Sequence, residues 1–86
     1  ADLLQRIHAA EEKLKSSGVR QVRIRAHGNI ARIEVEPGSV AQLAGDAARE
    51  QVITAVKSAG FEYVTLDLEG YRQGSMNTGI KESADE

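Results

Sequence analysis

The sequence contains no cysteine and no tryptophan, only one proline, and just 3% aromatic residues. Without cysteine the chain can form neither disulfide bonds nor thiolate metal sites, and it carries no cysteine nucleophile. With so few aromatics, its core must be built from valine, isoleucine, leucine and alanine. The lack of cysteine also fits a reducing compartment, so we expect a cytoplasmic protein.

Long hydrophobic runs are missing as well, so we expect neither a membrane span nor a signal segment. The 86 residues, 41% hydrophobic and 28% charged, are typical of one globular domain with one core. The formal net charge of −2 gives the whole molecule no attraction for nucleic acid. The charge is nevertheless uneven, because Arg20, Arg23 and Arg25 fall in a stretch, 18–31, that contains no acid.

Hydrophobic periodicity predicts two main helices and three strands. Apolar residues at helical spacing indicate a helix from Leu3 that ends near Gly18. Strict alternation indicates two strands, 22–27 and 30–36, joined by the two-residue hairpin turn Gly28–Asn29. The remaining predicted elements are a short helical turn over 39–44, a second main helix from Asp46 to about Ala59, and a third strand, Tyr63–Glu69, with Val64, Leu66 and Leu68 inward.

The element order α-β-β-α-β predicts a two-layer α+β domain, with both main helices on one face of a three-stranded sheet. A helix joins the second and third strands, which requires a right-handed crossover and a parallel relation between them. We expect the third strand to lie antiparallel beside the first, which places the first strand in the middle. The domain covers 1–69, and 70–86, rich in Gly, Ser, Asn and charge, is an irregular or disordered tail.

The hairpin turn fixes the register of the first two strands. Ala26 then faces Ala31 on the core side, whereas Arg25 faces Arg32 on the opposite, charged side. Arg23 faces Glu34, which is a favourable cross-strand pair.

Two directly opposed guanidinium groups need an anion between them or a carboxylate from a neighbouring strand. The third strand offers Asp67 and Glu69, so one interpretation is a ladder of salt bridges on a solvated face. The other is an anion site in which Arg23, Arg25 and Arg32 hold a phosphate or a carboxylate.

The sequence does not support a metal site, a catalytic histidine or a phosphate-binding loop. No His, Asp or Glu group has metal-ligand spacing, so we predict no metal site. His8 and His27 are interpreted as ordinary surface residues. The stretch Gly70–Ser75 has glycines but no helix pattern after it, so it is not a phosphate-binding loop.

Three motifs resemble the ATP-dependent sacrificial sulfur transferases, a branch of the PP-loop ATPases. The stretch 60–77, Gly-Phe-Glu-Tyr-Val-Thr-Leu-Asp-Leu-Glu-Gly-Tyr-Arg-Gln-Gly-Ser-Met-Asn, resembles the closing motif of that family. The hairpin, with Val-Arg-Ile-Arg-Ala-His-Gly followed by Ile-Ala-Arg-Ile-Glu-Val, resembles a second motif, and Ala10-Glu11 a third. Gln73 departs from the family, in which serine is most frequent at that place.

The resemblance implies an N-terminal PP-loop domain that binds ATP and Mg²⁺ and adenylylates a carboxylate of a pyridinium mononucleotide. A protein cysteine then gives its sulfur, on the route to the nickel-pincer nucleotide. This sequence has neither the nucleotide loop nor a cysteine. The resemblance therefore implies a C-terminal, substrate-side and assembly domain, cut from a longer chain at Ala1, with the PP-loop domain as its partner. On that basis we expect no cofactor and no activity in this chain alone.

Residue by residue, the resemblance puts the substrate-binding arginine pair of the family on Arg23 and Arg25. It puts the acidic residue of the site on Glu11, which could orient the arginines or handle a proton. Residues of the closing motif to which no role is assigned are Asp67, Arg72, Ser75 and Asn77.

The alternative from a different class is a docking or oligomerisation module, because a small open sheet with unpaired edges invites partners, including a second copy of the chain. RNA binding through the arginines is the third hypothesis. The acidic overall balance and the scarcity of aromatic residues for base stacking argue against it.

Overall fold

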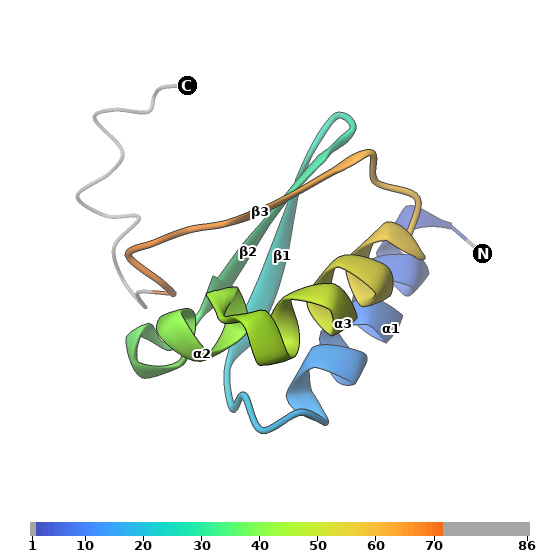
Figure 1. The fold of residues 1–86 in the computed structure, drawn as a ribbon. Helices are drawn as coiled ribbons and strands as arrows, with labels where there is room; N and C mark the ends of the chain where they lie inside the picture. Colours follow the sequence, from blue (N-terminus) through green and yellow to red (C-terminus); the bar gives the residue numbers. More distant parts are fainter. Residues whose placement is uncertain (1, 72–86) are drawn as a thin grey trace.

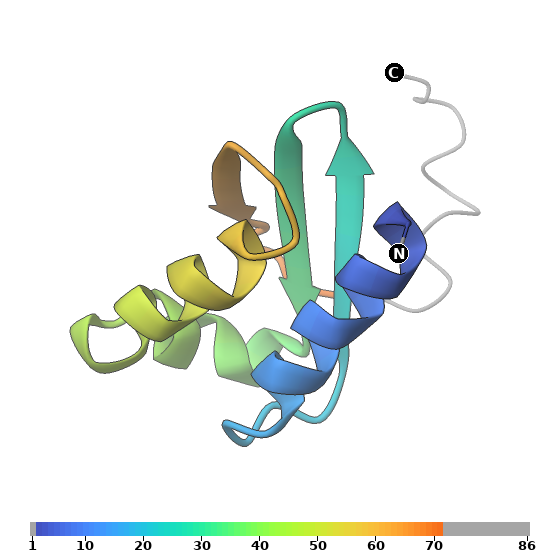
Figure 2. The same ribbon diagram turned by 90° about the vertical axis from the view of Figure 1, so that its right-hand side faces the viewer.

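The computed structural model describes residues 2–71. They form a two-layer α+β domain in which the main helices cover one face of a three-stranded sheet, which confirms the predicted fold class (Figures 1 and 2). The elements in chain order are α1 (Leu3–Lys15), β1 (Val22–His27), β2 (Ile30–Val35), the 3₁₀ turn η1 (Pro37–Ser39), α2 (Val40–Ala44), α3 (Asp46–Lys57) and β3 (Tyr63–Leu66).

The hairpin of β1 and β2 has the register that the sequence predicts. Arg25 lies opposite Arg32, Arg23 opposite Glu34 and Ala26 opposite Ala31. The turn depends on glycine, because Gly28 has a φ of 61°, in the left-handed region that residues with a side chain rarely adopt.

The strand order is β1-β2-β3, so β2 lies in the middle. The parallel pairing of β2 with β3 is confirmed, but the prediction that β3 lies beside β1 is wrong. The outer edge of β1 is already in use, because the backbone N–H of Ile24 donates to the carboxylate of Glu11 on α1 at 3.0 Å. β3 pairs instead with β2, and the N–H of Asp67 extends that pairing by donating to the carbonyl of Ile33 at 2.9 Å.

The core lies between the sheet and the helices. α1 and α3 lie against the same face of the sheet (Figures 1 and 2), and the buried apolar residues of each helix recur at helical spacing. Most of the core side chains are aliphatic, as the composition predicts, and Phe61 is the aromatic residue among them. The buried apolar residues are Ile7, Ala10, Leu14, Val19, Val22, Ile24, Ala31, Ile33, Val35, Leu43, Val52, Ala55, Val56, Ala59 and Phe61.

β3 is shorter than predicted, and its last predicted core residue lies outside. The strand ends at Leu66, and Leu68 is 80% exposed. The chain turns at Asp67, whose carboxylate accepts the N–H of Glu69 at 2.9 Å and whose carbonyl accepts the N–H of Gly70 at 3.0 Å. Ala26 is also exposed although predicted inward, because it lies near the hairpin tip, which projects beyond the helices in Figure 1.

The turn brings the chain back onto the end of β2. The N–H of Tyr71 donates to the carbonyl of Val35, and Gly70 is buried beside it. Gly70 and Tyr71 are thus packed on the domain, whereas the remainder of the predicted tail lies outside the described residues. Gly70 has a φ of 81°, and a Cβ atom there would lie 2.7 Å from the carbonyl oxygen of Val35 and 3.1 Å from the Cα atom of Pro37.

We predict that Gly70→Ala lowers the free energy of unfolding by about 2–4 kcal/mol, because the new methyl group meets backbone atoms and the φ angle is strained. Urea unfolding followed by circular dichroism measures the change. Gly38→Ala is the matched control, because a Cβ at Gly38 meets nothing within 4 Å. It should leave stability unchanged or raise it by about 0.4–1 kcal/mol. Equal stability of the two variants would show that the Gly70 segment is not held against β2.

Candidate functional site

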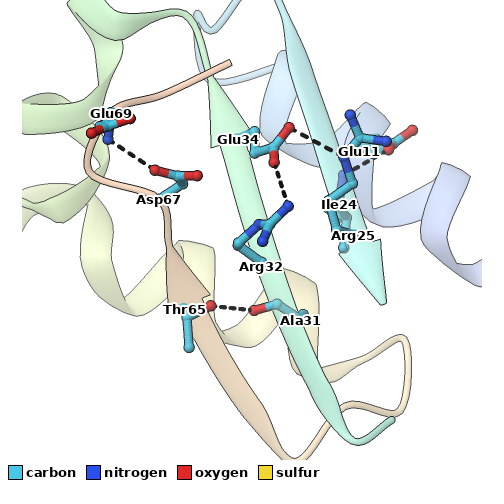
Figure 3. Close-up of polar contacts among 9 residues, drawn as sticks. All are labelled: Glu11, Ile24, Arg25, Ala31, Arg32, Glu34, Thr65, Asp67 and Glu69. Atoms are coloured by element: carbon cyan, nitrogen blue, oxygen red, sulfur yellow. Dashed lines mark hydrogen bonds and ion pairs between the residues drawn. The ribbon is translucent and has the colours of Figure 1, made fainter. Parts of the chain in front are cut away.

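The face of the sheet that points away from the helices carries the predicted arginines. We call it the charged face, and define it by Arg23 and Arg25 on β1 and by Arg32 and Glu34 on β2. Because alternate residues of a strand point to the same side, their side chains share this face. Figure 3 shows Arg25, Arg32 and Glu34 at its centre.

Glu34 is the centre of the charged face and is only 8% exposed. Its carboxylate accepts from the Nε of Arg25 at 3.2 Å and from the Nη2 of Arg32 at 2.9 Å, so it lies between the two guanidinium groups (Figure 3). This contact resolves the opposition of the two arginines. It also corrects the predicted side-chain pairing of Glu34 with Arg23, since the carboxylate reaches diagonally across the hairpin and along its own strand instead.

The neutralising carboxylate was predicted on the third strand, and that prediction is wrong. β3 ends before Asp67, and the Asp67 carboxylate accepts the backbone N–H of Glu69 within its own turn. Thr65, on β3, donates its hydroxyl to the carbonyl of Ala31 at 2.8 Å (Figure 3). Of the two predicted interpretations, the salt-bridge ladder is therefore present, with Glu34 as its acid.

The ladder is not neutral. Two arginines share one carboxylate, so the three side chains carry a net charge of +1. The Nε of Arg32 is buried and has no hydrogen-bond partner among the residues described. An unpaired buried N–H is costly, so the ladder is stabilised less than one in which every donor is paired.

Arg23 lies apart from the ladder. The carbon at the centre of its guanidinium group is 5.7 Å from the centroid of the Tyr71 ring, which is within range of a cation–π contact. It lines a cleft of about 190 Å³ together with Lys15, Arg20, Gln21, Val22 and Tyr71. Arg23 and Arg25, predicted as one pair, thus have different surroundings. Tyr71 belongs to the closing motif, but the sequence indicated no role for it. The contact with Arg23 on β1 exists only because the chain returns onto the end of β2.

Glu11 is half-buried beside the edge of β1. Its Oε2 atom accepts the N–H of Ile24, which otherwise would be an open hydrogen-bond donor of an edge strand (Figure 3). This contact gives Glu11 a structural part in the fold. A role of Glu11 in proton transfer stays a prediction.

Glu36 has a structural role that the sequence did not indicate. Its carboxylate accepts from the backbone N–H of Arg20 at 3.0 Å and from that of Gln21 at 2.8 Å, so it holds the loop between α1 and β1. These two hydrogen bonds favour the charged form and lower the pKa of Glu36 from 4.5 to about 2.

Several other predictions can be located. His8 and His27 are exposed, and within residues 2–71 no cluster of His, Cys, Asp and Glu could hold a metal ion. None of the helices in that range is long and apolar enough to cross a membrane. The motif residues Arg72, Ser75 and Asn77 lie outside the described residues.

Two longer proteins are similar to the chain over most of its length. It is 43% identical over 74 residues to an uncharacterized protein, slr1717, of Synechocystis sp.. The aligned residues make up 86% of the chain and 28% of that protein. It is 41% identical over 76 residues to the pyridinium-3,5-bisthiocarboxylic acid mononucleotide synthase of Lactiplantibacillus plantarum. Here the aligned residues make up 88% of the chain and 27% of that protein. The chain thus spans less than a third of the length of either relative. No family model matches it.

We predict that Glu34→Gln destabilises the domain, because it leaves Arg25 and Arg32 opposed without a countercharge. Breaking a fully buried ion pair costs about 3–5 kcal/mol. The two arginine side chains are 40% and 43% exposed, so solvent screening reduces the expected loss to about 1–3 kcal/mol. Urea unfolding measures it. Glu50→Gln, on the exposed side of α3, is the control and should change stability by less than about 0.5 kcal/mol.

Sulfate should restore part of the lost stability of Glu34→Gln, because it can take the place of the carboxylate between the arginines. Sodium chloride at the same ionic strength should restore less. A variant as stable as the wild-type protein in both salts would contradict the role given to Glu34.

We predict a pH dependence of stability that comes from Glu36. Because the pKa of Glu36 is lower in the folded protein, its contribution is fully present above about pH 4.5 and is lost as the pH falls towards 2. Glu36→Gln should therefore lower the melting temperature at pH 7, since its amide can accept only one of the two N–H groups. The difference from wild type should shrink as the pH falls to 2. A difference that stays constant from pH 7 to pH 2 would contradict this assignment.

Proposed function

We propose that this chain is the substrate-side domain of an ATP-dependent sulfur transferase that converts a carboxylate of a pyridinium mononucleotide into a thiocarboxylate. The observation that carries the proposal is the 41% identity, over 88% of the chain, to a protein named pyridinium-3,5-bisthiocarboxylic acid mononucleotide synthase. That name describes a product with two thiocarboxylic acid groups and one nucleotide phosphate. By the resemblance of the motifs, the pathway would lead to the nickel-pincer nucleotide.

The charges of the described residues support this substrate class. A pyridinium mononucleotide carries a phosphate and ring carboxylates, both of which arginine binds through paired N–H donors. Arg25 and Arg32 are aimed by their strands and by Glu34, which limits the side-chain freedom that binding would have to remove. The two side chains are 40% and 43% exposed, so their outer N–H groups can donate to an incoming oxyanion.

In this proposal the chemistry of activation belongs to another part of the enzyme. The chain has no cysteine to supply sulfur, and the described residues offer no cluster for a metal ion. They also do not fit ATP, because no glycine-rich loop opens a helix after a strand. We therefore assign ATP and Mg²⁺ to a PP-loop domain and the sulfur to a cysteine outside this chain. The relatives, more than three times as long as the matched segment, have room for both.

Glu11 is proposed as the acid of the same site. One carboxylate oxygen is fixed by the N–H of Ile24, so the side chain cannot swing away from the edge of β1. The second oxygen can accept a hydrogen bond from a substrate group or take up a proton.

We predict that Arg25→Ala in the full-length enzyme lowers the rate of thiocarboxylate formation by at least about tenfold, since one charge-assisted hydrogen bond contributes about 1.5–3 kcal/mol. The measurement is product formation by mass spectrometry, with ATP, Mg²⁺ and the pyridinium dicarboxylate mononucleotide supplied. Lys57→Ala is the matched control, because it removes a cation from the exposed end of α3. It should leave the rate within about twofold of wild type, and the 86-residue chain alone should form no product.

Sedimentation of the same variants separates the proposal from the docking alternative. Ile30 and Tyr63, which lie side by side on neighbouring strands and are 38% and 56% exposed, are the observation in favour of docking. If Arg25→Ala changes the oligomeric state together with the rate, the arginine belongs to an interface. A normal rate in Arg25→Ala would contradict the proposed substrate site.

A further inference from the structure

A cleft opens where the end of α1, the loop before β1 and the returning chain at Tyr71 meet. It has a volume of about 190 Å³ and is lined by Lys15, Arg20, Gln21, Val22, Arg23 and Tyr71. We call it the α1–β1 cleft. Half of its lining residues are cations, and none is an acid. Pockets for whole small molecules measure about 300–1,000 Å³, so this cleft has room for one group of a larger ligand.

The cations of the cleft have little else to bind. Arg20 and Arg23 make no ion pair within residues 2–71, and Arg23 is held against the face of the Tyr71 ring. Lys15 pairs with Glu12 only at 3.8 Å, and these two side chains are 46% and 75% exposed. Exposed pairs one helical turn apart contribute little, so an anion could easily draw Lys15 away.

The carboxylate of Glu36 fixes the backbone of the loop that lines the cleft. Its two oxygens accept the backbone N–H groups of Arg20 and Gln21 at 3.0 and 2.8 Å, and it does not line the cleft. The loop that carries Arg20 is thereby fixed without the use of its side chain. The guanidinium group stays available for a ligand.

We propose that the α1–β1 cleft binds the phosphate group of a phosphomonoester. A phosphate dianion offers three acceptor oxygens, which suits three cations, together with the amide of Gln21 and the hydroxyl of Tyr71 as neutral donors. A carboxylate has one charge and two oxygens and would leave one of the cations unmatched. The inference is drawn from the cleft alone and does not depend on the proposed function.

The short distance along β1 between Arg23 in the cleft and Arg25 in the ladder indicates that one ligand could contact both. Arg23 and Arg25 are two residues apart on β1, so their side chains leave the strand about 6.6–6.8 Å apart on the same face. A phosphate at Arg23 therefore places the remainder of the ligand near Arg25 and Arg32. The two arginines taken as one pair from the sequence would hold two different groups of one ligand.

The test is a titration of the ¹⁵N-labelled 86-residue chain with inorganic phosphate and, separately, with a nucleoside 5′-monophosphate, followed by amide chemical shifts. We expect saturable shifts at Arg20–Arg23 and at Tyr71 with both probes. Arg20→Gln and Lys15→Gln should each weaken binding by about tenfold. Lys57→Gln, distant on α3, is the matched control and should change it by less than about twofold. The spectrum of each variant also shows that it is folded.

Several results would overturn the proposal. One is shifts that centre on Arg25, Arg32 and Glu34 while the cleft residues stay unchanged. Another is equal weakening by Arg20→Gln and Lys57→Gln. The third is the same shifts with sodium chloride at equal ionic strength, which would mark general screening. Binding of free phosphate but not of the monophosphate would exclude the phosphomonoester class and mark a site for the free ion. Because no ATP, sulfur donor or second domain is present, failure of the proposed function would leave this result unaffected.

Discussion

The carboxylate of Glu34 is the contact on which the charged face depends. The hairpin register forces Arg25 and Arg32 to face each other, and this register is itself fixed by the turn at Gly28 and by the apolar residues on the other side of the same strands. The register that packs the core therefore also places two positive charges opposite each other on the other face of the sheet. Glu34 offsets their repulsion from within the same sheet at 3.2 and 2.9 Å, and so the two guanidinium groups have fixed positions.

The arginines consequently divide into two kinds. Arg25 and Arg32 are held by a carboxylate and retain a net positive charge, so they can orient an anion at little entropic cost. Arg20 and Arg23 make no ion pair within residues 2–71, so no carboxylate there offsets their charge. A ligand with two anionic groups would use both kinds, one for position and one for affinity.

The sequence pattern correctly predicted the features of the fold that are set by residues close together in the chain, above all the hairpin register. Alternation and the Gly28–Asn29 turn were sufficient for the register, because both constrain the same two strands. The strand order was not accessible from local pattern, since the edge of β1 is occupied by Glu11, a helix residue 13 positions before its partner Ile24. The partner of the arginines was missed for a similar reason. A cross-strand rule considers only directly opposite residues, whereas Glu34 reaches a diagonal neighbour and its own strand.

Tyr71 shows how a backbone requirement can produce a site. Only glycine fits at position 70, because a Cβ there would lie 2.7 Å from the carbonyl oxygen of Val35. The close approach lets the N–H of Tyr71 reach that same carbonyl and carries its ring across to Arg23. At the other side of the cleft, Glu36 fixes the backbone that carries Arg20. Both walls are thus held by backbone hydrogen bonds that do not use the cationic side chains, so the fold can be stable while the cations remain available to bind.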